Sequence, residues 1–359
     1  MLPAQYYQNI YLLIVTAIFL FHIQRYRTNL LQETSMPSKI SSEVIVAVLF
    51  FAFFVGLRPV HIVFVDMVGY AFRFDYFSHI KPGYSWLVEN KIFDNLFIYL
   101  STNGWTKSLF FLLMSFVYFV GTFIVCKKMF KRHVLIAYLV WLGAFSTFSY
   151  GVNGIKAGVA ATFFLLAIAY NKNVKISILF LLISLGFHHS MTLPLGAFSI
   201  AYFFRNTKVY FIAWAICLLM AFLHINFFSE LLAGLTDDRG AEYLLGGSNW
   251  GGKSGFRIDF VIYSAMPVLV GYWALFRRCV KSFTYELLLS IYLITNAVWM
   301  LCMYANFTNR IAYLSWSLYP IVLIYPFFKE DFGPDRYHKF SVVAMFHLFF
   351  TLFMMFIYY

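Results

Sequence analysis

Long apolar runs alternate with short polar connections along the whole of this 359-residue chain. A helix needs about 20 predominantly apolar residues to cross the hydrocarbon core of a bilayer, and such runs recur often enough to predict about twelve transmembrane helices. The predicted spans cover residues 5–24, 42–57, 108–126, 133–149, 154–170, 174–188, 190–204, 209–227, 258–276, 284–303, 310–328 and 340–358. We therefore expect an all-α fold in which residues 1–359 form a single polytopic membrane domain.

Two longer connections interrupt this pattern. Residues 58–107 carry too many charged side chains to cross a bilayer, so we expect amphipathic or re-entrant helices that lie at the membrane interface. Residues 228–257 are rich in glycine and polar residues and are predicted to form a loop. The stretch TDDRG at 236–240 offers two aspartates as metal ligands, but a solvated loop in which Arg239 contacts a substrate is the favoured interpretation.

The composition agrees with a membrane protein. Hydrophobic residues make up 62% of the chain and charged residues 12%, whereas an average globular protein has about 25% charged residues. The net charge of +12 is spread over the loops and forms no Lys/Arg-rich stripe, so we do not expect nucleic acid as a partner. The four cysteines have no CxxC spacing, and we predict neither a disulfide framework nor a metal site, and no cofactor.

Basic residues are concentrated in alternate, shorter connections. If both termini face outward, six connections face inward, and these hold most of the 27 Lys and Arg residues. The inward connections are residues 25–41, 127–132, 171–175, 205–208, 277–283 and 329–339. The positive-inside rule favours this orientation, which puts both longer connections on the outer side.

Four cations lie on that outer side, close to Gly, Pro or Asn residues that break helices: Arg58, Lys156, Arg257 and Arg310. A charge at the centre of a membrane helix costs about 2.5–3.5 kcal/mol on insertion scales and less near the ends. Each cation taken alone could extend to the lipid headgroups. Together they predict an outward-facing cavity for an anion. Guanidinium groups pair bidentately with phosphate oxygens, so a pyrophosphate carried on a polyprenol is a suitable ligand.

Two further groups of residues could take part in proton transfer. His188 and His189, in SLGFHHSM, stand between two apolar runs, where they could bind a sugar hydroxyl or move a proton, or simply anchor a re-entrant turn. Asp66 and Tyr70 share one face if their segment is helical, with Arg73 on nearly the same face. That face is either part of a site or an ion-paired surface.

Four segments resemble EpsG-like, Wzy-type bacterial polysaccharide polymerases, over about residues 50–328. The segments are GLRPVHIVFVDMVGYAFRF, GFHHSM, GFRIDFVIYSAMPVLVGY and NFTNRIAYLSWSLYPIVLIYP. Asp66 and His188 match the aspartate and histidine of the family pattern. The chain departs from it at NGIKAG, where family members often read Asn-x-x-Arg-Gln. Lys156 there keeps the charge of the arginine but not its bidentate fork.

The resemblance implies a GT-C-like membrane glycosyltransferase in the bacterial inner membrane, with both termini periplasmic. It implies a polymerase that joins undecaprenyl-pyrophosphate-linked repeat units of O-antigen or capsule at the periplasmic face. The implied partners are these lipid-linked oligosaccharides, the lipid bilayer, a chain-length regulator and a flippase. As catalytic residues we predict Asp66, His188 and Asp259, with Asp66 as the favoured proton acceptor. As residues that bind substrate or pyrophosphate we predict Arg58, Tyr70, Lys156, His189, Arg239, Arg257 and Arg310.

Other functions fit parts of the sequence. A flippase for lipid-linked oligosaccharides, or a transporter of another anion, would also need many spans and basic cavities. It predicts charges on both sides of a central path and internally repeated halves, and the sequence has no recognisable repeat. An O-antigen ligase and a membrane acyltransferase that modifies sugars are the enzymatic alternatives.

Overall fold

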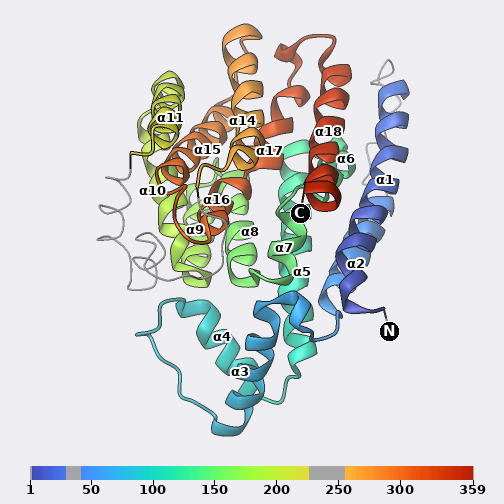
Figure 1. Cartoon of the computed structure of the whole chain (residues 1–359), viewed down its shortest axis with the longest axis vertical. Helices are drawn as coiled ribbons and strands as arrows, with labels where there is room; N and C mark the ends of the chain where they lie inside the picture. Colours follow the sequence, from blue (N-terminus) through green and yellow to red (C-terminus); the bar gives the residue numbers. More distant parts are fainter. Residues whose placement is uncertain (1, 30–41, 226–254, 359) are drawn as a thin grey trace. The chain divides into compact units, whose positions relative to one another are not determined.

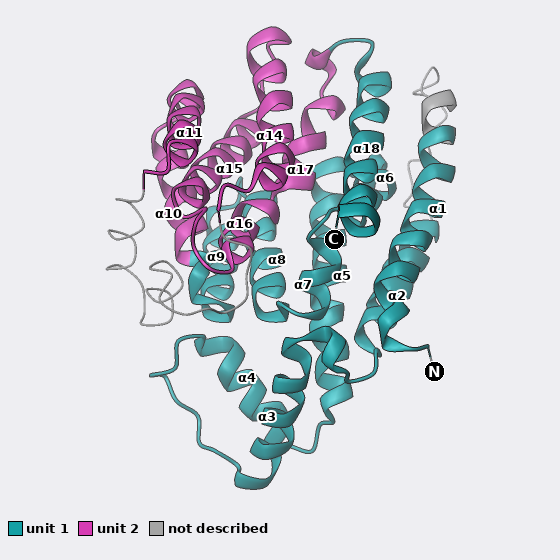
Figure 2. Ribbon diagram, in the orientation of Figure 1, with its two compact units in different colours: residues 1–191, 333–359 teal, residues 192–332 magenta. Residues whose placement is uncertain are grey.

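The computed structural model describes residues 2–29, 42–225 and 255–358. Every regular element in these ranges is a helix (Figure 1), which confirms the predicted all-α class for the described residues. The chain forms two compact units, each described by itself below (Figure 2). Unit 1 comprises Met1–Met191 and Gly333–Tyr359, and unit 2 comprises Thr192–Phe332.

Unit 1 contains most of the N-terminal half of the chain together with the C-terminal helix. Its α-helices are α1 (Tyr7–Asn29), α2 (Ser42–Gly56), α3 (Asp66–Ile80), α4 (Lys91–Thr102), α5 (Lys107–Phe130), α6 (Val134–Leu142), α7 (Thr147–Val152), α8 (Ile155–Ala169), α9 (Val174–Phe187) and α18 (Arg336–Phe353). Short 3₁₀ turns are η1 (Ala4–Tyr6), η3 (Ile62–Phe64), η4 (Lys131–His133) and η5 (His189–Met191), and a π-helical turn, η9 (Met354–Tyr358), ends the unit.

Small residues and hydroxyl groups hold the helices of unit 1 together. Helix α5 packs against α2, α6 and α8. Gly121 of α5 approaches α8 so closely that a Cβ atom there would lie 2.4 Å from Thr162 Cγ2. Ser115 donates a hydrogen bond of 2.8 Å to a carbonyl of α2, and Ser184 donates one of 2.7 Å to the carbonyl of Ala160. Close approach at small residues and hydroxyl-to-carbonyl bonds are typical of helix packing within a bilayer.

Helix α18 returns to unit 1 because it packs on α6 and α1. The buried ring of His347 forms a hydrogen bond of 3.0 Å with the carbonyl of Val140. Helix α1 also packs on α6, where Tyr11 of α1 donates a hydrogen bond of 2.8 Å to the carbonyl of Leu142. These bonds, 207 and 131 residues apart in sequence, join the two ends of the chain to its middle.

Unit 2 is organised around α15. Its α-helices are α10 (Thr192–Phe203), α11 (Thr207–Phe222), α14 (Ile258–Tyr272), α15 (Phe283–Leu301), α16 (Thr308–Trp316) and α17 (Tyr319–Ile324). The π-helical turn η6 (Trp273–Arg277) follows α14, and the 3₁₀ turns η7 (Tyr325–Phe328) and η8 (Glu330–Phe332) follow α17.

A buried polar network connects the helices of unit 2. Trp214 of α11 donates to the side-chain oxygen of Asn296 at 2.8 Å, and the amide nitrogen of Asn296 donates to Ser315 of α16 at 2.9 Å. Trp316 donates to the hydroxyl of Ser264 in α14 at 2.8 Å. Each donor has a partner, as buried polar groups require, so the network fixes α11, α14 and α16 around α15.

Five helical segments among the described residues are long and apolar enough to cross a bilayer. A sixth results if the bent pair Thr308–Trp316 and Tyr319–Phe328, which meet at 41°, is one span. The five are Ala4–Gln24, Lys107–Leu142, Ile258–Arg277, Phe283–Leu301 and Arg336–Tyr358. The chain is therefore a multi-pass membrane protein, but the predicted number of about twelve spans is not confirmed.

Helix length accounts for the difference. The predicted spans 154–170 and 174–188 correspond to α8 and α9, which have 15 and 14 residues. At a rise of 1.5 Å per residue they extend over about 22 Å, less than the hydrocarbon core of about 30 Å. The predicted span 190–204 is α10, with 12 residues. The two spans predicted at 108–126 and 133–149 instead belong largely to one helical run, Lys107–Leu142.

Candidate functional site

Helix α3 has three faces of different chemistry. One packs into unit 1, one carries polar and charged side chains, and one is apolar but exposed. The buried face consists of Met67, Ala71 and Phe74, the polar face of Asp66, Tyr70 and Arg73, and the exposed apolar face of Val68, Phe72, Tyr76 and Ile80. Residues within each face recur at intervals of three or four, as expected for stripes along a helix.

Aromatic packing fixes α3 beside α4 within unit 1 (Figure 1). The ring of Phe74 lies 5.3 Å from that of Phe97 in α4 and 5.6 Å from that of Phe110 in α5. Helix α4 in turn packs on α9, where a Cβ atom added to Gly186 would lie 2.5 Å from the side chain of Ile92. This packing brings the polar face of α3 close to the start of α8 and the end of α9.

Five ionisable side chains meet there, and we call them the charged cluster. Lys156, in the first turn of α8, is half-buried and interacts electrostatically with the four others. Its ammonium nitrogen lies 5.2 Å from the centre of the Phe93 ring. Arg73 Nη1 lies 3.8 Å from Asp94 Oδ1. The charged cluster consists of Asp66, Arg73, Glu89, Asp94 and Lys156.

Asp94 is the buried member of this cluster. It lies in the first turn of α4 and is 6% exposed. Its Oδ1 accepts no hydrogen bond within the described part of the chain. We did not predict Asp94 as a site residue. The available signal was an acidic residue inside the apolar stretch KIFDNLF, next to residues that face the core.

The two histidines end α9 and turn the chain toward α4. His188 has an extended backbone, and its Nδ1 accepts a hydrogen bond of 3.2 Å from the backbone N–H of Ser190. The backbone N–H of His189 donates to the side-chain oxygen of Asn90 at 3.0 Å. His189 Nδ1 lies 3.6 Å from a carboxylate oxygen of Glu89. Asn90 and Glu89 thus connect the histidines to the charged cluster.

Arg58 is buried and bonds to backbone carbonyls. Its two terminal nitrogens donate to the carbonyls of Val55 and Val152, at 2.7 and 2.6 Å. The guanidinium lies 5.4 Å from the ring of Phe64 and 5.3 Å from that of Phe111. Burial lowers the pKa of Arg58 to about 9, which leaves it protonated at neutral pH. Arg58 therefore connects the end of α2 to the end of α7.

Three predicted site residues lie in the described part of unit 2. Arg257 Nε and Nη2 donate to the two carboxylate oxygens of Asp259, and both side chains are largely buried. The guanidinium of Arg257 also lies 3.7 Å from the centre of the Phe260 ring. Arg310, in the first turn of α16, is exposed and lies 5.0 Å from the ring of Phe307.

The predicted residues therefore form two groups. In unit 1, Asp66 and Lys156 belong to the charged cluster and His189 adjoins its Glu89, while the ring of Tyr70 lies 5.9 Å from that of Phe93. His188 immediately precedes His189 in the chain. Arg239, and all of the predicted loop 228–257 except residues 255–257, lie outside the described residues. Within the described ranges, no three His, Cys, Asp or Glu side chains gather as a metal site.

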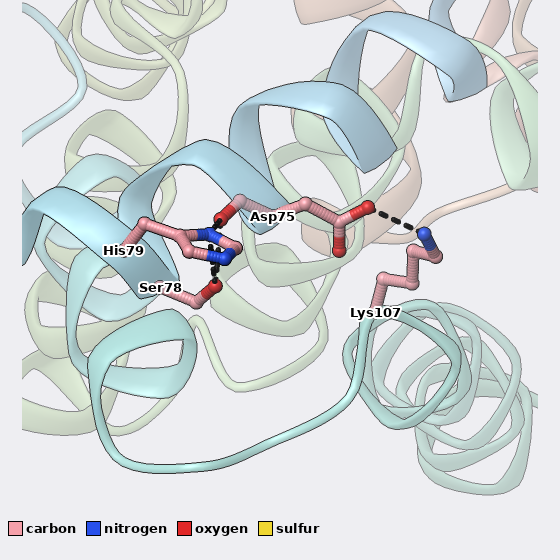
Figure 3. A network of polar contacts seen from close by, with 4 residues as sticks. All are labelled: Asp75, Ser78, His79 and Lys107. Carbon is pink, nitrogen blue, oxygen red and sulfur yellow. Dashed lines mark hydrogen bonds and ion pairs between the residues drawn. The ribbon is translucent and has the colours of Figure 1, made fainter.

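Asp75, two residues after Arg73 in α3, forms a second ion pair (Figure 3). The carboxylate of Asp75 pairs with Lys107 at the start of α5. The backbone carbonyl of Asp75 accepts a hydrogen bond from the hydroxyl of Ser78 at 2.6 Å and interacts with His79 Nδ1 at 2.7 Å. Both side chains of this ion pair are exposed, whereas Asp94 in the pair with Arg73 is buried. The Asp75–Lys107 pair is therefore a solvent-exposed reference for the buried aspartate.

Comparison with known proteins identifies a family but no individual relative. A model of the EpsG family matches residues 44–359. No curated protein matches the chain. No solved structure matches it either.

Proposed function

Because the chain belongs to the EpsG family, we propose that it is a polysaccharide polymerase of the Wzy type. It joins undecaprenyl-pyrophosphate-linked oligosaccharide repeat units at the periplasmic face of the bacterial inner membrane. The growing glycan on one carrier is transferred to the non-reducing sugar of the repeat unit on another carrier. Undecaprenyl pyrophosphate is released.

The charged cluster is the observation that supports this reaction best. The attacking sugar hydroxyl must give up a proton to a base within hydrogen-bond reach. Negative charge that develops on the departing pyrophosphate must be stabilised, which cations do well where water is excluded. The cluster combines carboxylates with the cations Arg73 and Lys156, and it adjoins the histidine pair.

The cations of the site divide into two kinds. Arg58 and Arg257 are already bonded, to backbone carbonyls and to a carboxylate. We therefore assign them a structural role. Lys156 of the charged cluster is more accessible, and we propose that it contacts the pyrophosphate. Arg310 is exposed in unit 2, and we propose separately that Arg310 and Arg239 bind substrate. Tyr70 and His189, beside Lys156, are proposed to bind the sugar.

The exposed face of α3 supports a location of the site at the membrane surface. Phe72 of this face is 74% exposed, and the loop that follows α3 exposes Trp86 to 77%. Exposed Trp and Tyr side chains close to Lys are typical of the membrane–water interface, and Lys81 and Lys91 flank this loop. We propose that residues 58–107 lie at the periplasmic membrane interface. The side chains of the charged cluster then face the other helices of the protein, and the exposed face of α3 meets the lipid.

We propose periplasmic termini and a GT-C-like arrangement of helices. Polymer growth on lipid carriers also requires a flippase that delivers them, and a chain-length regulator is a further proposed partner. The lipid bilayer and lipid-linked sugars are the chemical environment in which such a site works.

The decisive experiment supplies the purified protein, in nanodiscs, with a synthetic undecaprenyl-pyrophosphate-linked repeat unit. We expect a ladder of polymer lengths together with released undecaprenyl pyrophosphate. A deletion strain should display surface glycan with a single repeat unit. Absence of surface glycan, with transport of the intact lipid-linked unit by the protein in liposomes, would instead establish a flippase.

A further inference from the structure

We propose that Asp94, rather than Asp66, accepts the proton of the attacking sugar hydroxyl. This inference rests on the proposed function, because it assigns a role within that transfer reaction. Three observations support it: the burial of Asp94, the bonds that already engage other candidate bases, and the cations beside it.

Burial favours Asp94 over Asp66. A polymerase must transfer the glycan to a sugar and not to water, so the proton acceptor should lie where water is excluded. Asp94 is 6% exposed, whereas Asp66 is half-buried at the start of α3. Asp94 Oδ1 has no hydrogen-bond donor among the described residues. A buried carboxylate oxygen without a donor is costly to maintain, and a hydroxyl group would satisfy it.

Two other predicted bases are engaged in bonds that oppose the role. Both oxygens of Asp259 accept hydrogen bonds from Arg257. His188 Nδ1 accepts the backbone N–H of Ser190, so the proton of a neutral imidazole lies on Nε2. Nε2–H can donate to a sugar oxygen, but it has no free lone pair with which to accept the proton of the attacking hydroxyl.

The cations near Asp94 can also stabilise the negative charge of the leaving group. Asp94 lies in the first turn of α4, a position at which the helix dipole favours an anion. Arg73 is 43% exposed and contacts Asp94 at 3.8 Å, beyond hydrogen-bond length. Such a contact can be exchanged: the guanidinium can turn to the pyrophosphate while the sugar hydroxyl binds the carboxylate. Lys156 completes the positive surroundings.

The chemical step then balances. The hydroxyl oxygen of the acceptor sugar attacks the anomeric carbon of the donor, and its proton moves to Asp94. The bond between that carbon and the pyrophosphate oxygen breaks, and its electron pair leaves with undecaprenyl pyrophosphate. Arg73 and Lys156 stabilise the new charge. Asp94 later releases the proton to water, which restores the carboxylate.

Asp94→Asn tests this role, and Asp75→Asn is the matched control. Both variants change a helical aspartate paired with a cation, but the Asp75–Lys107 pair is exposed (Figure 3). Polymerisation of lipid-linked repeat units is measured in nanodiscs, with binding of the same substrate measured separately. We expect Asp94→Asn to bind substrate but to polymerise about a hundred- to ten-thousand-fold more slowly. Asp94→Glu should keep part of the activity, and Asp75→Asn should equal the wild type.

Arg73→Gln separates a proton acceptor from a purely structural ion pair. If Asp94 only holds Arg73, then Arg73→Gln and Asp94→Asn should lose activity equally, and the double variant should be no worse than either. Under our proposal Asp94 acts on the proton and Arg73 on the leaving group, so the double variant should be clearly slower than either single variant.

Each outcome decides between the hypotheses. Near-normal turnover of Asp94→Asn, or a double variant no slower than either single variant, would overturn the role of Asp94 while wild-type polymer still supports the proposed function. Unfolding of Asp94→Asn at the assay temperature, combined with a fully inactive but folded Asp94→Glu, would also count against it. If the wild type makes no polymer, both proposals fall.

Discussion

Replacement of Arg58 by Ala should lower the stability of the fold, and it should reduce polymer production only through that loss of stability. The side chain donates two short hydrogen bonds from a charged group to the carbonyls of Val55 and Val152. Hydrogen bonds of this kind contribute about 1.5–3 kcal/mol each, so the free energy of unfolding should fall by about 3–6 kcal/mol. For a domain of about 150–250 residues, 1 kcal/mol corresponds to about 2–4 °C. A decrease in melting temperature of at least about 6 °C should follow.

The measurement is a thermal melt of the purified protein in detergent, combined with polymer production at low and high growth temperature. Arg58→Lys is the control, because it keeps the charge but not the fork that reaches both carbonyls. Since the pKa of Arg58 is about 9, the side chain is charged in the folded and the unfolded chain at neutral pH. The difference in free energy of unfolding between the wild type and Arg58→Ala should therefore not change with pH below about 9.

One result would refute this reasoning. If Arg58→Ala melts like the wild type but makes no polymer at any temperature, Arg58 acts on the substrate, as the sequence pattern first indicated. If instead polymer returns at low temperature, where the variant is folded, Arg58 holds the end of α2 to the end of α7.

Three further predictions concern packing, charge and topology. Gly186→Leu should displace Ile92, and α4 with it, so polymer production should fall while membrane insertion is retained; unchanged activity would contradict the packing of α4 on α9. Arg257→Ala should lower the free energy of unfolding by about 3–5 kcal/mol because it leaves a buried carboxylate unpaired, and removal of Asp259 as well should restore part of the loss in a thermal melt. Cys279 is exposed and should react with a membrane-impermeant maleimide only after permeabilisation; labelling of intact cells would reverse the proposed orientation.

The helical fold was predictable because apolar runs of this length have few other solutions. The number of spans was not, since a run of 14 or 15 apolar residues between turn signals looks the same whether or not it crosses a bilayer. Hydropathy reports which residues avoid water. It does not report where a helix ends, which depends on breaks such as Asn153–Gly154 before α8.

The candidate site was predictable in part for a similar reason. Residues of unusual chemistry in an apolar sequence, such as Lys156 and His189, stand out, and in the structure both interact with Glu89. The state of each cation was not predictable, because a charge bonded to backbone carbonyls and a charge open to a ligand look identical in sequence. Asp94 was missed because its segment had been treated as a surface, whereas α4 packs against α9 and buries it.

The three faces of α3 limit how this region can change during evolution. One residue inserted within the helix rotates everything after it by about 100°, which would carry Arg73 toward the core and bring buried or exposed apolar side chains to its place. Substitutions that respect each stripe are tolerable, but changes of length are not. Insertions and deletions among relatives should therefore fall in residues 81–90, where the backbone between α3 and α4 is irregular. An alignment that opens a gap inside Asp66–Ile80 pairs residues with unrelated surroundings.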